Sequence, residues 1–441
     1  MLRNSFTSRH GRLLLFVIAG LSLMRAASAL ANTAGHWVGA WSAAPVHAPI
    51  EPNVQLRQPP SNPSLHMQTV REFVRIGADG DRLRIHLDNR YGTQAVRFGR
   101  VTIARVMADG SDAIDASSSR AVTFTGMAQF ALPPGGVADS DPITMNVIAG
   151  QQLAVSLYVP DGAQSASWHP DTRYRQSLSA PGDHTGEARL VDAQQTAGYD
   201  WLSRIDVFAT EQTQAIVALG DSITNGYHAS PQHSYPEQLA ERLRAARCAR
   251  PVLNAGIDGN QVAAGLSNFG QGDRMRDRLS HDVLDVPGAR YVLLLGGIND
   301  IGEPTMAARN AGKPLPEANV MAQPVIEALQ AMAGKMKAKG LRVYGATVLP
   351  FEGTQGAYTA QGEAARQMIN AWIRHQARYD AVIDFDAVMR DPAHPARMQA
   401  RYDSGDHIHP DDAGYRAMAD AIPLALFGCS QASMRTDGTA R

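Results

Sequence analysis

The sequence predicts an α/β protein with two unlike parts, an N-terminal all-β domain and a C-terminal domain built on a parallel sheet. Short strand-like runs separated by turn residues fill residues 36–210 without a helical pattern. From Ala215 onward, apolar strands alternate with helical segments. That order places helices on both faces of a parallel sheet.

The N-terminal domain, residues 36–210, is predicted from strands of period two. Leu83, Ile85 and Leu87 alternate with polar residues, as expected of a strand that buries one face. Further strands are predicted over residues 101–106, 121–125 and 152–159, with turn clusters at residues 78–81 and 133–136. Strands at this spacing, with no helix between them, favour an antiparallel sandwich or jelly roll.

The second domain is expected over residues 214–430, and residues 431–441 are expected to be a flexible tail. Its strands are predicted at residues 215–219, 251–254, 291–295, 341–348 and 381–385. A capping box with a proline in the first turn opens a helix at Ser234, and further helices are predicted over 319–338, 363–376 and 414–427. Ligands of such sheets bind beyond the carboxyl ends of the strands.

The N-terminus has the pattern of a secretory signal. Arg3, Arg9 and Arg12 precede an apolar run from Leu13 to Met24, and small residues suited to cleavage follow. We therefore predict a signal peptide over residues 1–31 and export, to a periplasm or outside the cell. The alternative is a short anchor that is never cleaved. An apolar run of about twelve residues is too short for a stable span, so no stable membrane anchor is expected after cleavage.

The composition is that of an ordinary globular protein, with 44% hydrophobic and 19% charged residues and a net charge of −1. No excess of positive charge indicates nucleic acid or an anionic membrane surface as a partner. Cys248 and Cys429 are the two cysteines. In an exported protein a lone pair suggests one disulfide, and the alternative is two unrelated buried thiols.

Three polar residues predict nucleophilic catalysis. Ser222 follows the first strand of the second domain, and Asp406 and His409 lie together near the end of the chain. A serine needs an imidazole to take its proton, and the imidazole needs a carboxylate to fix its tautomer. We therefore predict Ser222 as nucleophile, His409 as base and Asp406 as the acid that orients the base.

Two neighbours of these residues have competing interpretations. Asp221 is a candidate for the catalytic acid, but at the strand end it is better suited to bonding the backbone N–H groups of the loop. His407 rivals His409 as base, and the His-x-His pattern suggests a metal site. We expect neither a metal nor a cofactor, because no third soft ligand stands nearby.

Two segments at the following strand ends predict an oxyanion hole. Gly259, in the Asn-Ala-Gly-Ile-Asp-Gly-Asn segment that ends at Asn260, would offer its backbone N–H, although in isolation this is simply a glycine turn. Asn299, in Gly-Gly-Ile-Asn-Asp, would offer its side-chain amide. With the N–H of Ser222 they would hold the developing negative charge of an ester carbonyl.

These four segments, in this order, resemble the SGNH hydrolase superfamily, the GDSL esterases and lipases, over about residues 214–427. The resemblance implies a three-layer, flavodoxin-like fold and the roles Ser222, Gly259, Asn299, Asp406 and His409 already given. Within the superfamily the chain is similar to the subgroup near the xylanase-associated esterase XynE, whose members are arylesterases or acetyl esterases acting on plant polysaccharides. One departure is Asn225, where many relatives have aspartate.

The predicted function is that of a serine esterase removing acetyl or other short acyl groups from carbohydrate. Trp37, Trp41, Trp168 and Trp201, in or beside the β domain, suit stacking on sugar rings; the alternative is packing in the core or at a domain interface. Other possible functions are a lipase, lysophospholipase or broad arylesterase, and, in another class, a carbohydrate-binding protein with a vestigial hydrolase domain. The expected partner is a small-molecule or polysaccharide ester.

Overall fold

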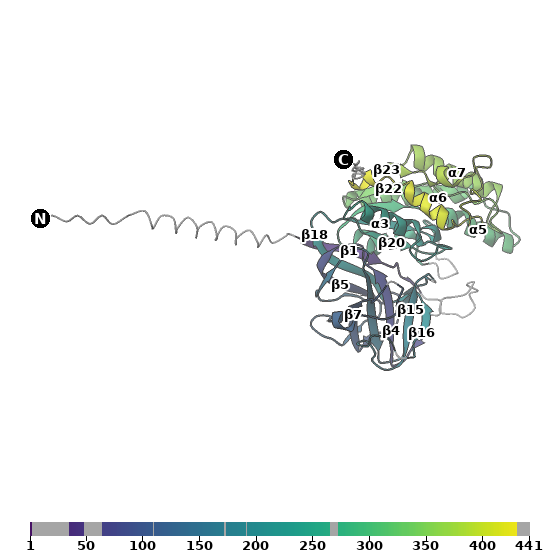
Figure 1. Ribbon diagram of the computed structural model, residues 1–441. Helices are drawn as coiled ribbons and strands as arrows, with labels where there is room; N and C mark the ends of the chain where they lie inside the picture. The colour runs from purple at the N-terminus through teal and green to yellow at the C-terminus, as the bar shows by residue number, and fades with distance from the viewer. Residues whose placement is uncertain are drawn as a thin grey trace. The chain divides into compact units, whose positions relative to one another are not determined.

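Two antiparallel sheets make up the N-terminal part of the computed structural model, which describes Met1 and residues 35–47, 64–108, 110–171, 173–190, 192–264 and 272–429 (Figure 1). The first sheet contains β1 (Gly35–Ser42), β18 (Leu202–Thr210), β5 (Gly80–Asp88), β10 (Val137–Asp139) and β11 (Ile143–Val147). The second contains β16 (Gln194–Ala197), β15 (Arg175–Pro181), β4 (Gln68–Arg75), β12 (Gln152–Val159), β7 (Arg100–Arg105) and β8 (Arg120–Val122). Both sheets contribute apolar side chains to one core, among them Val74, Ile85 and Leu157. The predicted all-β region is therefore confirmed.

Shorter strands extend this region at its edges. They are the pairs β3 (Ser64–Leu65) with β13 (Ala163–Gln164) and β6 (Val96–Phe98) with β9 (Phe130–Leu132), and the three strands β2 (Val46–His47), β14 (Ser167–His169) and β17 (Tyr199–Asp200). Trp168 and Trp201 are core side chains, with exposures of 3% and 1%. Trp37 and Trp41 are half-buried and pack edge-on against aromatic rings of the same region. Packing thus accounts for the four tryptophans.

The C-terminal part is built on a five-stranded parallel sheet. Its order is β20 (Val252–Gly256), β19 (Ala215–Gly220), β21 (Ala289–Leu294), β22 (Arg342–Ala346) and β23 (Ala381–Ile383). The first strand in the chain lies between the second and the third, which is the flavodoxin-like order. The predicted three-layer α/β/α fold is confirmed, and a crevice for ligands is expected where β19 meets its neighbours.

Helices follow the strands in two packed groups. The longer ones are α3 (Tyr235–Ala245), α5 (Ile298–Asn310), α6 (Ala318–Ala338), α7 (Ala360–His375) and α9 (Asp412–Asp420). The shorter ones are α2 (Ser222–Asn225), α4 (Met275–Leu279), α8 (Phe385–Met389), the 3-10 turns η1 (Ala116–Ser118) and η3 (Leu424–Phe427), and the π turn η2 (Ser280–Leu284). Helix α9 packs on α3 and α8, whereas α6 packs on α5 and α7. Sheet and helices share one apolar core.

Two predictions about helices were wrong. The last helix does not run unbroken from 414 to 427, because α9 ends at Asp420 and Pro423, which cannot donate an N–H, separates it from η3. Helix α5 was missed, because Gly302 and Pro304 lower the helical propensity of its first turns. The capping box at Ser234 is present as predicted, with Glu237 bonding back to the Ser234 backbone.

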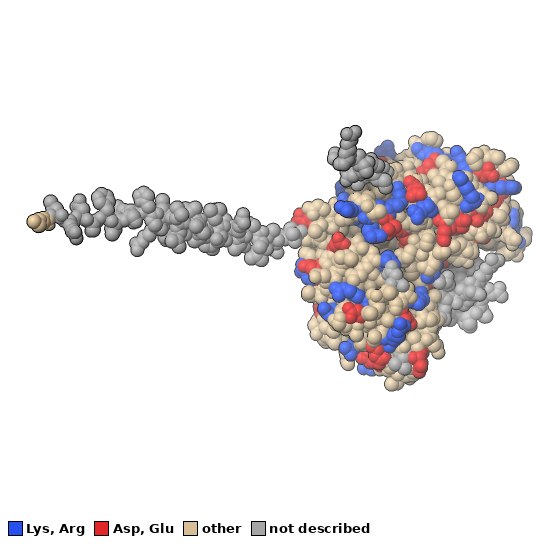
Figure 2. Space-filling model, viewed as in Figure 1, with Lys and Arg blue, Asp and Glu red and all other residues tan. Residues whose placement is uncertain are grey.

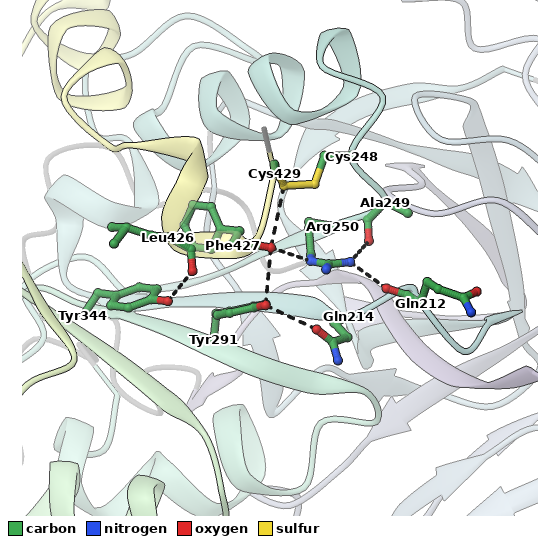
Figure 3. Close-up of a disulfide and its surroundings, with 10 residues drawn as sticks. All are labelled: Gln212, Gln214, Cys248, Ala249, Arg250, Tyr291, Tyr344, Leu426, Phe427 and Cys429. Atoms are coloured by element: carbon green, nitrogen blue, oxygen red, sulfur yellow. Dashed lines mark hydrogen bonds between the residues drawn. A yellow bond between two sulfur atoms is a disulfide. The ribbon is translucent and has the colours of Figure 1, made fainter. Parts of the chain in front are cut away.

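A disulfide joins Cys248, just after α3, to Cys429 at the end of the described chain (Figure 3). The two Cα atoms are 5.9 Å apart. Beside it, the Arg250 guanidinium donates to the carbonyl of Phe427 at 3.1 Å, and the Tyr291 hydroxyl donates to the same carbonyl at 3.3 Å (Figure 3). The bridge and these bonds connect the C-terminal segment to the end of α3, to the start of β20 and to β21.

The ends of the chain are described only in part. The described residues from His36 to Cys429 lie in one compact unit. The predicted signal peptide and the predicted tail at 431–441 lie outside the described residues, and the domain boundaries stay predictions. Among helices within the described ranges, none is both long enough and apolar enough to cross a bilayer. Lysine and arginine are interspersed with aspartate and glutamate on the face in Figure 2, as the net charge of −1 suggests.

Candidate active site

The three predicted catalytic residues lie together. Ser222 opens α2 directly after β19, and its Oγ is 2.8 Å from Nε2 of His409. Nδ1 of His409 is 2.6 Å from Oδ2 of Asp406. Because the carboxylate only accepts, the Nδ1 proton points at Asp406, and Nε2 is left to accept the proton of the serine hydroxyl. This is the hydrogen-bond order of a nucleophile, its base and the orienter of that base.

The Asp406 carboxylate is held by its own loop. Its Oδ1 accepts from the backbone N–H groups of Ile408 and His409, at 3.0 and 2.9 Å. Partial burial opposes ionisation of Asp406, but the hydrogen bond and charge of His409 outweigh it and hold the pKa of the carboxyl well below its ordinary value. Asp406 is therefore a carboxylate at neutral pH, as its proposed role requires.

His228 is a residue of the site that sequence reasoning missed. Its Nε2 is 3.2 Å from Oδ2 of Asp406, the oxygen that also accepts from His409. The ring of Tyr227 packs against both imidazoles, with its centroid 4.5 Å from that of His228 and 4.7 Å from that of His409, and the two imidazole centroids are 5.8 Å apart. The backbone at His228 is left-handed, with φ of 67°. No motif signals this contact, since it depends on how the loop after α2 turns back over the base.

Asp221 and His407 occupy supporting positions. Oδ1 of Asp221 caps α2 by accepting from the Ile223 N–H at 3.0 Å. Burial raises the pKa of Asp221 to about 7, against the opposing effects of Ile223 and His409. His407 lies in a turn with φ of 67° and bonds Asp403, with Nδ1 2.6 Å from Oδ2. The turn, and not alternation along a strand, separates His407 from His409.

The predicted oxyanion donors lie at the ends of adjacent strands. Ser222 is the first residue of α2, so its N–H has no carbonyl four residues earlier to bond. Gly259 has φ of 71°, a conformation that glycine adopts without strain. Asn299 is the second residue of α5, and its Nδ2 donates to the carbonyl of Asn260 at 3.0 Å. The second hydrogen of that amide remains for a bound oxyanion.

Arg278 is a second residue that sequence reasoning missed. It is 1% exposed and donates to the carbonyl oxygens of Gly220 and Ala255, at 2.8 and 2.9 Å, which closes the ends of β19 and β20 together. Its Nε bonds Oδ1 of Asn260 at 3.0 Å, and Asp282 balances its charge at 2.6 Å. A lone arginine in a helix has no distinctive pattern in the sequence.

Within the described residues one group has the spacing of a metal site. Ligand atoms of His228, Asp406 and His409 all lie within 4.8 Å of one another. An ion bound there would compete with His409 for the Asp406 carboxylate. It would therefore disrupt the hydrogen bonds that join Asp406, His409 and Ser222. Ser222, His409 and Asp406 are joined by hydrogen bonds in this structure, and His228 contacts Asp406 at 3.2 Å.

Residues 218–417 match the GDSL-like Lipase/Acylhydrolase family. No curated protein matches the chain. Among solved structures, the lipase/acylhydrolase from Enterococcus faecalis is 19% identical, with a TM-score of 0.37 over 50% of this chain and 100% of that one. The carbohydrate acetylesterase family member from Sinorhizobium meliloti is 18% identical, with a TM-score of 0.37 over 48% and 97%. The acetyl xylan esterase AlAXEase is 19% identical, with a TM-score of 0.34 over 47% and 96%. The family match shows a GDSL-like lipase/acylhydrolase domain over residues 218–417, and it supports an ester-hydrolysing enzyme.

Proposed function

We propose that this protein is an exported serine esterase that removes acetyl or other short acyl groups from carbohydrate through an acyl-enzyme intermediate. The observation that carries the mechanism is the pair of contacts at His409, 2.8 Å to Ser222 and 2.6 Å to Asp406. His409 takes the proton of Ser222 as its oxygen attacks the ester carbonyl, and the imidazolium then protonates the leaving alcohol. Water releases the acyl group by the same route in reverse.

The donors at the strand ends stabilise the charge that develops on the carbonyl oxygen. Ser222 N–H, Gly259 N–H and the Asn299 amide are the three groups proposed for this task. Loss of one such donor typically costs about 3–4 kcal/mol of barrier. Asn299→Ala should therefore lower kcat by about two to three orders of magnitude with a small effect on KM.

The choice of a sugar as leaving alcohol is supported by the surface beside the base. Tyr227 is 37% exposed, and its ring centroid lies 4.7 Å from that of His409. In the proposed mechanism His409 is the group that protonates the leaving alcohol. An exposed aromatic ring there offers a face on which a sugar ring can stack. Tyr227→Ala should raise KM for acetylated xylan severalfold and leave the turnover of ethyl acetate nearly unchanged.

One assay separates the candidate functions. The purified protein should release acetate from acetylated xylan and cleave short-chain nitrophenyl esters, and Ser222→Ala should abolish both. Faster turnover of long-chain than of acetyl esters would favour a lipase. Binding of xylan without release of acetate would favour a carbohydrate-binding protein.

A further inference from the structure

A histidine of the N-terminal β region lies next to the helix that carries the nucleophile. His169, at the end of β14, is 5% exposed. Its Nδ1 is 2.8 Å from the carbonyl oxygen of Ala44, and its Nε2 is 3.3 Å from Oδ1 of Asn225. Both partners are oxygens that only accept, so each ring nitrogen faces a fixed acceptor. His169 therefore fixes which way the Asn225 amide points.

Asn225 also bonds the segment that carries Gly259, the predicted oxyanion donor. Its Nδ2 donates to Oδ1 of Asp258 at 2.9 Å, and Asp258 precedes Gly259 directly. Asn225 is 4% exposed, so this bond is shielded from water. Burial raises the pKa of Asp258, and the hydrogen bond from Asn225 opposes that rise. The amide thus stabilises the carboxylate form of Asp258.

The other side of the same loop is anchored independently. Asn260 is bonded through its side chain to Arg278 and through its carbonyl to the Asn299 amide, both at 3.0 Å. Gly259 therefore lies between two fixed neighbours. On one side, Asp258 is bonded to Asn225, and Asn225 in turn is bonded to His169 of the β region.

A second contact anchors the strand that carries His169 to the α/β region. Arg173 donates through Nη2 to Asp171 at 2.7 Å and through Nη1 to Glu237 of α3 at 3.1 Å. Glu237 in turn accepts from the hydroxyl and the N–H of Ser234 at the start of α3. The Arg173 side chain is 8% exposed. This ion pair holds the β region against α3 and so keeps His169 within reach of Asn225.

We propose that His169, Asn225 and Asp258 form a positioning relay, through which the N-terminal β region holds Gly259 and α2 in the geometry that the ester reaction requires. The relay rests on the proposed function and assigns a task to the β region. Its members touch no substrate atom; they act through the loop that carries Gly259 and through the helix that carries Ser222.

The relay also explains asparagine at position 225. An aspartate there would accept from His169 as well, but it would place a second carboxylate against the buried Asp258. Like charges at that distance repel strongly when they are screened from water. The buried carboxylate at position 258 therefore favours asparagine over aspartate at position 225.

The test is an exchange of the two side chains. Asn225→Asp should lower kcat for nitrophenyl acetate by about ten- to a hundredfold with little change in KM, because the loop is displaced and not the substrate site. The double variant Asn225→Asp/Asp258→Asn restores one amide beside one carboxylate and should recover kcat to within about threefold of wild type. His169→Phe keeps an aromatic ring but neither ring nitrogen, and should lower kcat about three- to tenfold.

A matched pair in the β region supplies the control. Gln176 donates to Asp200 at 2.6 Å, and both are buried, at 1% and 3% exposure, but neither contacts α2 or the Gly259 loop in the described contacts. Gln176→Glu should lower the melting temperature about as much as Asn225→Asp and leave kcat unchanged. Melting curves of all variants separate damage to folding from displacement of the loop.

The outcomes divide cleanly. Recovery of kcat in the double variant supports the relay, including where Asn225→Asp alone fails to fold. A double variant no better than Asn225→Asp, wild-type kcat in His169→Phe, or an equal loss of kcat in Gln176→Glu would overturn it. These results presuppose a wild type that hydrolyses esters and an inactive Ser222→Ala. Without that pair of results the proposed function fails, and the relay fails with it.

Discussion

The proposed nucleophile, Ser222, and the proposed base, His409, come from regions that differ in their exposure to water. Ser222 is 6% exposed, and it lies among buried polar groups that include Arg278, at 1%. Across the site, the side chains of His409 and Asp406 are 13% and 33% exposed, and those of the neighbouring His228 and His407 are 44% and 49% exposed. One side of the site is therefore part of the core of the protein, and the other is part of its surface.

This difference follows from the two tasks. Oxyanion donors work best when they are held in place before the reaction, in surroundings that exclude water. A base must exchange its proton with a leaving alcohol and with solvent, so it cannot be sealed in the core. Substitutions on the nucleophile side should therefore cost stability and activity together, whereas those on the base side should cost activity alone.

Asp406→Asn should give the largest effect and should test the base side. The asparagine amide would favour the wrong tautomer of His409, so kcat should fall by about four orders of magnitude. The free energy of unfolding at pH 7 should change by less than about 1 kcal/mol, because the loop lies at the surface. Steady-state kinetics and urea unfolding measure the two quantities. A loss of several kcal/mol of stability would contradict the claim that substitutions on the base side cost activity alone.

Arg278→Met should test the nucleophile side. It removes the donors that close β19 and β20 and leaves the buried Asp282 with His281 but without Arg278, which should cost about 3 kcal/mol of stability. Activity should fall with it, because Asn260 loses the bond from the Arg278 side chain. Arg276→Met, on the same short helix but 42% exposed, is the control and should cost less than about 0.5 kcal/mol. Equal effects of the two variants would contradict the assignment.

Much of the comparison could be predicted from the sequence, because some features depend on short stretches of chain. The parallel strands were recognisable as apolar runs, and Ser222, Gly259 and Asn299 each follow one of them directly. Asp406 and His409 are three residues apart, so their bond forms within one loop. When residues are this close in sequence, the local backbone structure largely determines their relative positions.

The contacts that could not be predicted join residues far apart in the chain. His169 and Asn225 are separated by 56 residues, and Arg278 and Gly220 by 58. Neither contact follows from a periodicity or a spacing, because each depends on the packing of two folded regions. The buried polar residues around a catalytic loop therefore have to be found in the structure.

Asp221→Asn should sharpen the comparison through pH. Asp221 is 1% exposed, and burial raises its pKa to about 7 from an ordinary value of 3.8. Between these values the folded protein keeps a proton that the unfolded chain releases, so the contribution of Asp221 to stability falls as pH rises from about 4 to 7. Asparagine has no such dependence. The unfolding free energy of the variant relative to wild type should therefore rise by up to about 4 kcal/mol across this range.

Asp115→Asn is the contrasting variant. Asp115 also caps a helical turn, but it lies at the surface, and its hydrogen bond from Ser117 lowers its pKa. Its contribution is present above the ordinary pKa and is lost as pH falls below about 4. The two variants should thus show opposite pH trends in urea unfolding. If the unfolding free energy of Asp221→Asn relative to wild type did not change with pH, the Asp221 carboxyl would not be shielded from water as its burial implies.

His228→Ala should give the smallest effect and should test whether the exposed side holds a second donor for the acid. Removing the 3.2 Å contact with Asp406 should lower kcat about three- to tenfold, because a half-exposed polar contact with a carboxylate is worth about 1 kcal/mol. His228→Gln, which keeps a donor, should recover most of the loss. His407→Ala is the matched control: it is similarly exposed but bonds Asp403 and not Asp406, so kcat should stay within about twofold. If both alanine variants lowered kcat equally, the loss would reflect a loosened surface loop, and Asp406 would be oriented by His409 and its own backbone alone.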